Sequence, residues 1–419
     1  MRIGFDITAL YVAQAGIFYY DYNLIQALLR QDQEDEFLLL DYVPIHGGWT
    51  NPPQIAALHA PNAQVTHCQG LRHRRLTRWV PMQNPVLQPL AIVADQVLLK
   101  PWAMAAKSVM QRRLTLALDG VDVFHSSDLL LWKQPGALNV VTLYDLTVLL
   151  FPERHTANTR EIQQDKYRFA QQEADVVIAI SEATKQDIVN HLHIPEQRVR
   201  VVHGGVNPSF RPNLDQDAVE RALASLKVAY GRYILYVGTI EPRKNLVRLI
   251  EAYNQARKML PSPIPKLVIA GAAGWQFKTV FERVEALGLK DEVLFIGRVP
   301  DEKLPALYNG ALLFVYPSLY EGFGLPPLEA MSCGVPVITS NTSSLPEVVG
   351  EAGMLIDPTD VERLAVGMAE VLSSDDLRAD MRQRGLARAS HFSWERAARE
   401  TRAIYATAGT HLLDSSSQS

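Results

Sequence analysis

Two short segments carry charged residues whose types and spacing could do chemistry. The segment EGFGLPPLEA begins at Glu321 and contains Glu329 eight residues further on. The segment EPRKN contains Arg243 and Lys244, next to each other at the start of an expected helix. Cations are unfavourable at that end of a helix, so an anionic ligand explains the pair better than a solvated surface does. Paired cations could stabilise the negative charge that develops on a phosphate leaving group.

The segment EGFGLPPLEA also predicts a helix that begins close to a ligand. Gly322 and Gly324 permit a tight turn and a close approach of the backbone, and the two prolines suit the first turn of a helix. The amides of Gly324 and Leu325 would point out of the helix N-terminus, where a diphosphate binds well. We expect Glu329 in the first turn, accepting hydrogen bonds from a ribose, while Glu321 holds a sugar hydroxyl. The alternative is that the carboxylates only cap the helix dipole.

The second half of the chain supplies the elements that must position these residues. Apolar, β-branched runs without polar alternation recur between helical stretches, as in parallel strands covered on both faces. They occupy residues 233–238, 266–271, 293–297, 312–316, 335–339 and 353–357. Strands that alternate with helices predict a doubly wound α/β domain, in which ligands bind at the carboxyl ends of strands.

The first half shows the same alternation with more interruption. Its expected strands are residues 2–7, 36–41, 121–125, 139–143, 175–180 and 199–202. Residues 49–111 are expected to form an irregular insertion with a basic cluster, followed by Trp79 and, later, Trp102. The cluster consists of Arg72, Arg74, Arg75 and Arg78.

The chain therefore predicts two domains. The first is expected to span residues 1–206 and the second residues 207–392, because the run NPSFRP after Val206 is typical of a linker. Residues 411–419 form a serine-rich tail that we expect to be disordered.

Composition narrows the class of protein. The 419 residues are 47% hydrophobic and 21% charged, with a net charge of −4, so nucleic acid is not an expected partner. Two cysteines, Cys68 and Cys333, cannot make a disulfide framework or a structural zinc site. The first residues are too polar for a signal peptide and no apolar run is long enough to span a bilayer, so we expect a cytoplasmic protein.

The order EPRKN, then FIGRVPDEKLPALYNGA, then PSLYEGFGLPPLEAMSCGVPVITS resembles family 4 of the retaining glycosyltransferases, which have the GT-B fold. The resemblance covers nearly the whole chain and is strongest from about 175 to 400. It is similar in kind to bacterial mannosyl- and glucosyltransferases of polysaccharide or lipid-linked glycan assembly. It implies two Rossmann-like doubly wound domains facing across a cleft, with a C-terminal helix at about 393–410 crossing back to the first. The second domain would hold the nucleotide sugar and the first domain the acceptor.

The same resemblance assigns roles to single residues. Arg243 and Lys244 stand where the family has phosphate-binding cations, and the two glutamates of EGFGLPPLEA stand where its E-x7-E motif falls. Val299 would contact the base through its backbone, and Gly16 would approach the donor phosphates, unless it is a simple turn glycine. Ala15 replaces a glycine that many members carry. The expected donor-binding residues are Gly16, Val299, Gly322, Phe323, Gly324, Leu325 and Glu329.

One departure from the family concerns the general base. Tyr144 stands where members often carry a histidine, while the adjacent Asp145 is retained and could orient the acceptor or the transferring sugar. A tyrosine has a pKa near 10 and cannot replace a histidine at neutral pH. His125 closes another strand and is the other candidate, although a lone histidine there is more often structural. The expected catalytic residues are Arg243, Lys244, Glu321 and Asp145.

The resemblance implies transfer of a hexose with retention of configuration to a glycan or lipid-linked acceptor. GDP-mannose is the favoured donor and a UDP-sugar the alternative, and no metal is expected because cations and helix amides supply positive charge. A glucosyl-type transferase and an inactive sugar-nucleotide-binding module stay as alternatives. An epimerase would need a G-x-G-x-x-G fingerprint, which the N-terminal part lacks. The basic insertion could rest on the inner face of the cell membrane or form a solvated face.

Overall fold

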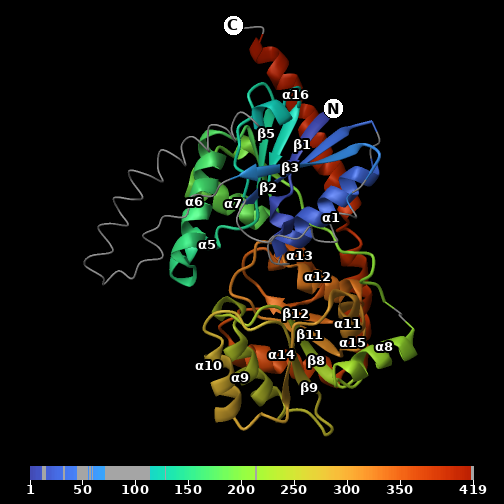
Figure 1. The fold of residues 1–419 in the computed structure, drawn as a ribbon. Helices are drawn as coiled ribbons and strands as arrows, with labels where there is room; N and C mark the ends of the chain where they lie inside the picture. The colour runs from blue at the N-terminus through green and yellow to red at the C-terminus, as the bar shows by residue number, and fades with distance from the viewer. Residues whose placement is uncertain are drawn as a thin grey trace, which may run out of the picture.

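The computed structural model describes residues 1–11, 16–31, 34–44, 55, 58, 60–70, 114–127, 129–212 and 215–416. Two parallel β-sheets, each covered by helices, form two domains that meet end to end (Figure 1). The basic cluster with Trp79 and Trp102 lies outside the described residues, as does Ala15.

The N-terminal sheet has seven strands in the order β3-β2-β1-β4-β5-β6-β7, all parallel. The strands are β1 (Arg2–Asp6), β2 (Glu36–Pro44), β3 (Ala63–Gly70), β4 (Val123–Ser126), β5 (Leu138–Leu143), β6 (Val176–Ala179) and β7 (Val199–Val201). The helices are α1 (Gly16–Gln31), α5 (Thr147–Leu150), α6 (Ala157–Gln172) and α7 (Glu182–Leu192), with 3₁₀ turns η1 (Thr8–Tyr11), η4 (Pro152–Arg154) and η5 (Glu196–Arg198). Each of the six predicted runs contains a strand.

The seventh strand, β3, corrects the prediction of an irregular insertion over residues 49–111. It pairs with β2 along eight residues, from Phe37 opposite Ala63 to Pro44 opposite Gly70. The strand lies at the edge of the sheet, and its sequence AQVTHCQG mixes apolar and polar residues. Its polar residues interrupt the apolar run by which the other strands were predicted.

The C-terminal sheet has six parallel strands in the order β10-β9-β8-β11-β12-β13, where the sequence predicts strands. The strands are β8 (Tyr233–Val237), β9 (Lys266–Ala270), β10 (Val293–Gly297), β11 (Leu313–Tyr316), β12 (Val337–Ser340) and β13 (Met354–Ile356). The α-helices are α8 (Gln216–Ser225), α9 (Leu246–Ala256), α10 (Lys278–Ala286), α11 (Leu304–Asn309), α12 (Leu325–Ser332), α13 (Leu345–Val349), α14 (Val361–Ser373) and α15 (Asp375–Ala389). The 3₁₀ turns are η6 (Pro242–Lys244), η7 (Asp301–Lys303) and η8 (Gly350–Ala352).

Two crossings of the chain join the domains, and they touch each other. Val206 N–H donates to the carbonyl of Phe392 at 3.4 Å. A Cβ added at Gly205 would lie 2.2 Å from the backbone nitrogen of Trp394, so only a glycine lets the two crossings pass this closely. The hinge between the domains is therefore a pair of adjacent backbone segments.

Helix α16 (Trp394–Ser416) follows the second crossing and packs on the N-terminal domain (Figure 1). Arg402 Nε lies 2.7 Å from Asp35, and the Trp394 and Tyr20 rings lie 5.4 Å apart at 81°. The helix continues past residue 410, so residues 411–416 are helical where the sequence suggested a disordered tail. Extending a helix that is already nucleated costs little. No described helix is both long enough and apolar enough to cross a bilayer.

Candidate active site

The two charged segments lie at the carboxyl ends of neighbouring strands. β8 ends at Val237 and leads to η6, which contains Arg243 and Lys244. β11 ends at Tyr316 and leads to the loop that carries Glu321. Because β8 and β11 are parallel partners, their carboxyl ends meet at one edge of the sheet. The fold thereby brings the cations and the glutamate together.

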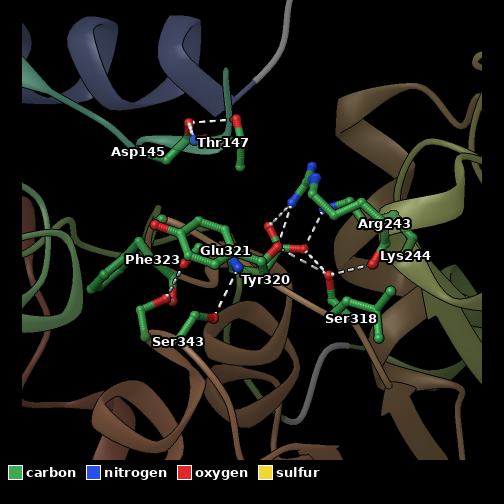
Figure 2. A network of polar contacts seen from close by, with 12 residues as sticks. Asp145, Thr147, Arg243, Lys244, Ser318, Tyr320, Glu321, Phe323 and Ser343 are labelled. Atoms are coloured by element: carbon green, nitrogen blue, oxygen red, sulfur yellow. Dashed lines mark hydrogen bonds and ion pairs between the residues drawn. The ribbon is translucent and has the colours of Figure 1, made fainter. Parts of the chain in front are cut away.

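The carboxylate of Glu321 is the centre of a buried ion cluster (Figure 2). Lys244 Nζ lies 2.6 Å from Oε1 and Arg243 Nη1 lies 2.9 Å from Oε2. Ser318 also donates to Oε1, and the Glu321 N–H donates to Ser343 Oγ at 2.9 Å. Burial alone would raise the pKa of Glu321, but the charges of Arg243 and Lys244 lower it to about 2. Glu321 is therefore ionised at any working pH and can only accept hydrogen bonds.

Arg243 fixes the backbone of the glycine-rich loop as well as supplying charge. Nη1 donates to the Tyr320 carbonyl at 2.7 Å, while Nε and Nη2 lie 3.0 and 2.7 Å from Glu241 Oε1. Burial lowers the pKa of Arg243, but the charges of Glu321 and Glu241 raise it above its usual value. An arginine has five N–H groups, and four of these have partners among the described residues. One N–H on Nη2 is left for a ligand.

Lys244 is held between an aromatic ring and the same carboxylate. Nζ donates to the Tyr316 hydroxyl at 2.6 Å and lies 5.0 Å from the centre of that ring. Burial lowers the pKa of Lys244, and the charge of Glu321 opposes this effect. Two of the three ammonium N–H groups have partners in the part of the chain that the structure describes. Each of the two cations thus keeps one donor for an oxygen of a bound anion.

Helix α12 begins directly after the glycine-rich loop. Gly324 has φ +122°, a conformation that residues with side chains avoid, and a Cβ added there would lie 3.1 Å from Leu345. Leu325 is the first helical residue, and the two prolines after it complete the first turn as predicted. Glu329 is consequently the fifth residue of α12. The prediction that it lies in the first turn was wrong, because four helical residues, Leu325 to Leu328, precede it.

Glu329 is a buried carboxylate of the site whose charge changes near neutral pH. It accepts a hydrogen bond from the Tyr308 hydroxyl at 2.8 Å. Burial raises the pKa of Glu329 to about 7, the charge of Asp301 adds to this effect and the Tyr308 hydrogen bond opposes it. Asp301 accepts hydrogen bonds from Tyr19 of α1 at 2.8 and 2.9 Å, so this charge belongs to a contact between the domains.

The N-terminal domain meets the glycine-rich loop at Gly322. A Cβ added there would lie 2.1 Å from the Tyr144 carbonyl oxygen and 3.1 Å from Asp145 Cβ. The Gly322 carbonyl also accepts hydrogen bonds from Ser181 Oγ at 2.7 Å and Thr184 Oγ1 at 3.2 Å. Gly322 is therefore required for a close approach of two backbones, and this is the reason that the position between Glu321 and Phe323 is a glycine.

Asp145 lies at the carboxyl end of β5 on the side facing the ion cluster (Figure 2). Its Oδ1 accepts hydrogen bonds from the Thr147 N–H at 2.9 Å and hydroxyl at 2.6 Å, which fix the side chain. Its charge contributes to the raised pKa of Arg243. Among the described residues, no donor contacts Oδ2, so this oxygen is available to a hydroxyl group of a ligand. The structure thus brings all four expected catalytic residues to one boundary between the domains.

His125 does not belong to this site. The side chain is fully buried, with Nδ1 2.5 Å from the Tyr405 hydroxyl and Nε2 2.7 Å from Thr142 Oγ1. Burial, with a smaller effect of the Lys166 charge, lowers the pKa of His125 to about 3. The expectation that His125 could be a general base was wrong, because both ring nitrogens already have hydrogen-bond partners. The ring instead attaches α16 to the N-terminal sheet.

Tyr144 contributes its backbone to the site but not its phenol. The hydroxyl donates to Asp21 of α1, and Lys166 Nζ lies 4.5 Å from the ring centre. The side chain is buried, with its ring 5.6 Å from that of Tyr20. The structure therefore corrects the possible catalytic role of Tyr144, since its side chain points into the N-terminal domain.

The side chain of Phe323 packs between the domains, so only its backbone could contact a donor. Its ring is buried, 5.9 Å from the His203 ring and 5.8 Å from the Phe392 ring, at the hinge between the domains. Packing there leaves no aromatic face for a donor. Its expected role in donor binding therefore stays a prediction for the backbone alone.

The remaining expected donor residues differ in what they offer. Val299 follows β10 with its side chain buried, so only its backbone could contact a base. Gly16 is the first residue of α1 and is exposed, and a Cβ added there would meet nothing within 4 Å. Packing within the protein therefore does not require a glycine at position 16.

Several residues of the site were not predicted. Ser318 and Ser343 hold Glu321, Tyr316 holds Lys244, and Thr147 holds Asp145. Ser318, three residues before Glu321 in the same loop, could have been found from its position after a strand. Ser343 belongs to a different loop from Glu321, so its sequence position carried no signal of this contact. No group of three or more His, Cys, Asp or Glu residues that could hold a metal occurs among the described residues.

Comparison with known proteins agrees with this architecture. Sucrose-phosphate synthase from Thermosynechococcus elongatus has a TM-score of 0.71 at 20% identity, over 98% of this chain and all of that chain. Residues 224–388 match the family described as Glycosyl transferases group 1, and residues 67–210 match Glycosyltransferase Family 4. The two-domain fold together with these family matches makes the chain a GT-B glycosyltransferase.

Two sequence relatives are mannosyltransferases of Escherichia coli. O-antigen chain mannosyltransferase B of Escherichia coli is 36% identical over 262 residues, which are 62% of this chain and 68% of that protein. The serotype-specific mannosyltransferase WbdA of Escherichia coli is 35% identical over 282 residues, which are 66% of this chain and 34% of that protein. The chain therefore belongs to glycosyltransferase family 4. It spans about a third of the length of WbdA and about two thirds of the first relative.

Proposed function

We propose that this glycosyltransferase moves mannose from GDP-mannose to a glycan or lipid-linked acceptor in bacterial polysaccharide assembly. The observation that carries the proposal is the cluster of Arg243, Lys244 and Glu321, which Asp145 faces from the other domain. Such a boundary can hold a donor on one side and an acceptor on the other. Mannose as the sugar is supported by two relatives that are named mannosyltransferases, one of them for the O-antigen chain.

The leaving group is the part of the donor for which the site is best equipped. As the bond between the anomeric carbon and the diphosphate breaks, negative charge grows on the phosphate oxygens. Arg243 and Lys244 each keep one N–H donor for such an oxygen, and the N-terminus of α12 adds backbone amides. Glu321 stays ionised between these cations and accepts hydrogen bonds from sugar hydroxyl groups. The carboxylate of Glu329 would accept hydrogen bonds from the ribose.

We expect the configuration at the anomeric carbon to be retained by attack on the same face. Glu321 is a poor nucleophile because its charge is neutralised by two cations. The side chain of Asp145 is held by hydrogen bonds from Thr147, so it is not expected to attack the sugar either. The acceptor oxygen therefore bonds to an oxocarbenium-like carbon as the phosphate leaves, and its proton goes to a phosphate oxygen. Asp145 Oδ2 would orient a hydroxyl during this step. No general base from His125 or Tyr144 is needed.

The donor is tested by calorimetric titration of the purified protein with GDP, UDP and ADP in parallel. We expect GDP to bind tightly and the others weakly, and we expect GDP-mannose to be consumed when a mannose-terminated acceptor is added. Selective binding of UDP would support a UDP-sugar-dependent transferase. Binding of none of them by folded protein would contradict the proposed donor site. Proton NMR of the product then distinguishes a retained from an inverted linkage.

Two further expectations are part of the proposal. Transfer should need no divalent metal, because the two cations supply the positive charge, so rates with excess EDTA and with Mg²⁺ should agree. The protein should work in the cytoplasm at the inner face of the cell membrane, with the basic residues around Arg74 on anionic lipid. Sedimentation with anionic vesicles at low and high salt tests this contact, and no binding in either condition contradicts it.

A further inference from the structure

The N-terminus of α7 is one of the places where the two domains are joined by hydrogen bonds. The first amides of a helix have no partner within the helix. In α7 the third amide, that of Thr184, is satisfied by the N-cap Ser181, whose Oγ accepts it at 3.0 Å. The first two amides belong to Glu182 and Ala183. Their partner comes from the other domain.

That partner is the carboxylate of Glu347 on α13. The Glu182 N–H donates to its two oxygens at 2.8 and 2.9 Å, and the Ala183 N–H lies 3.4 Å from Oε2. His203, in the crossing between the domains, contacts the same carboxylate through Nε2. The side chain of Glu347 is only 20% exposed. One carboxylate thus joins the C-terminal domain, a helix end of the N-terminal domain and the hinge.

Charge makes this contact stronger than ordinary hydrogen bonds. Burial raises the pKa of Glu347, but the contact with His203 and the α7 amides lowers it below its usual value, so the group is ionised. A helix N-terminus carries partial positive charge that favours an anion. Arg388 holds α13 from behind, donating to the carbonyls of Glu347 and Val348. The carboxylate is therefore presented by a braced element.

The same end of α7 also holds the glycine-rich loop. Ser181 and Thr184 donate to the Gly322 carbonyl, and Tyr320 donates to Asp187 at 2.5 Å. The residue between Tyr320 and Gly322 is Glu321. The contacts of α7 with the C-terminal domain therefore include the loop that carries Glu321, and this loop approaches Asp145 at Gly322.

We propose that Glu347 is a positioning residue, which by capping α7 across the domain boundary holds Asp145 in register with Arg243 and Glu321. It touches neither the donor nor the acceptor. The inference rests on the proposed transfer reaction for its catalytic consequence, while the contact itself can be measured without any substrate.

The contact is measured by hydrogen exchange of peptides covering residues 181–185 in the full chain. In Glu347→Ala the amides of Glu182 and Ala183 lose their partner and should exchange at least tenfold faster. Glu347→Gln keeps an acceptor without the charge and should give an intermediate rate. Glu351→Gln, an exposed carboxylate four residues further on, is the matched control and should exchange like the wild type.

The catalytic consequence is measured by comparing nucleotide affinity with kcat in the same variants. Because the proposed donor pocket is in the C-terminal domain, nucleotide affinity in Glu347→Ala should stay within about twofold. The kcat for transfer should fall at least tenfold, with Glu347→Gln between. Unchanged exchange at residues 182 and 183, or wild-type kcat in Glu347→Ala, would overturn the proposal. So would equal losses of affinity and kcat, which would indicate damage to the donor domain. If the wild type transfers no sugar, the proposed function fails, and the exchange rates still decide whether Glu347 caps α7.

Discussion

Replacing Gly322 with alanine tests whether transfer depends on the backbone contact between the domains. The φ angle of Gly322 is not in the left-handed region, so the backbone conformation itself tolerates alanine. The new Cβ, however, would lie 2.1 Å from the Tyr144 carbonyl oxygen, about 1 Å closer than carbon and oxygen ordinarily approach. Because the obstacle is backbone, no side-chain rotation relieves it, and the loop must move away from β5.

A displacement of about 1 Å between reacting groups can lower a rate about 100-fold, which corresponds to about 2.7 kcal/mol in the activation free energy. We expect kcat of Gly322→Ala to fall by about that factor. Nucleotide affinity should change little, because Arg243 and Lys244 belong to the same domain as the displaced loop. The assay measures kcat for transfer at saturating donor beside nucleotide affinity by calorimetry.

The matched control is Gly385→Ala in α15. A Cβ there would lie 3.5 Å from Met331, an ordinary contact, so both kcat and the melting temperature should be preserved. Transfer by Gly322→Ala at more than about a third of the wild-type rate would refute the reasoning. It would mean that Tyr144 and Gly322 can separate without disturbing the positions of Asp145 and Glu321.

Four other predictions follow from charge and burial. Lys244→Met should lower kcat by about 10²- to 10³-fold at saturating donor, since it removes one cation from the leaving group, and a tenfold loss or less would contradict that role. Glu329, whose pKa is about 7, should make nucleotide affinity rise with pH between 6 and 8; Glu329→Gln should remove that dependence, as calorimetry at several pH values would show. The same raised pKa stabilises the fold below pH 4.5 by about 3 kcal/mol, a contribution lost as the pH rises to about 7. His125 has its pKa lowered to about 3, so its contribution to stability is complete above pH 6.5 and is lost as the pH falls towards 3. Urea unfolding should show a shallower acid dependence in His125→Phe than in the wild type.

The sequence by itself determined the elements and the chemical types of the site. Parallel strands covered on both faces are largely apolar, so twelve of the thirteen strands in the described residues are visible as apolar runs in the sequence. The glycine and proline positions of EGFGLPPLEA are set by local backbone geometry, which is why the start of α12 was predictable. Strand β3 escaped detection because polar residues interrupt its sequence AQVTHCQG.

Only the tertiary structure decided which of these groups work together. Lys244 and Glu321 are 77 residues apart, and His125 and Tyr405 are 280 apart. The residues next to each partner in the sequence do not indicate that Lys244 and Glu321 form a charged site. They also do not indicate that His125 and Tyr405 form a buried hydrogen bond between α16 and the N-terminal sheet. Strand order and the crossing of α16 decide it, because hydrogen bonds and ion pairs extend about 3 Å and depend on packing between distant segments. The same short range explains why Gly322 meets Tyr144, and Glu347 meets α7, only in the folded chain.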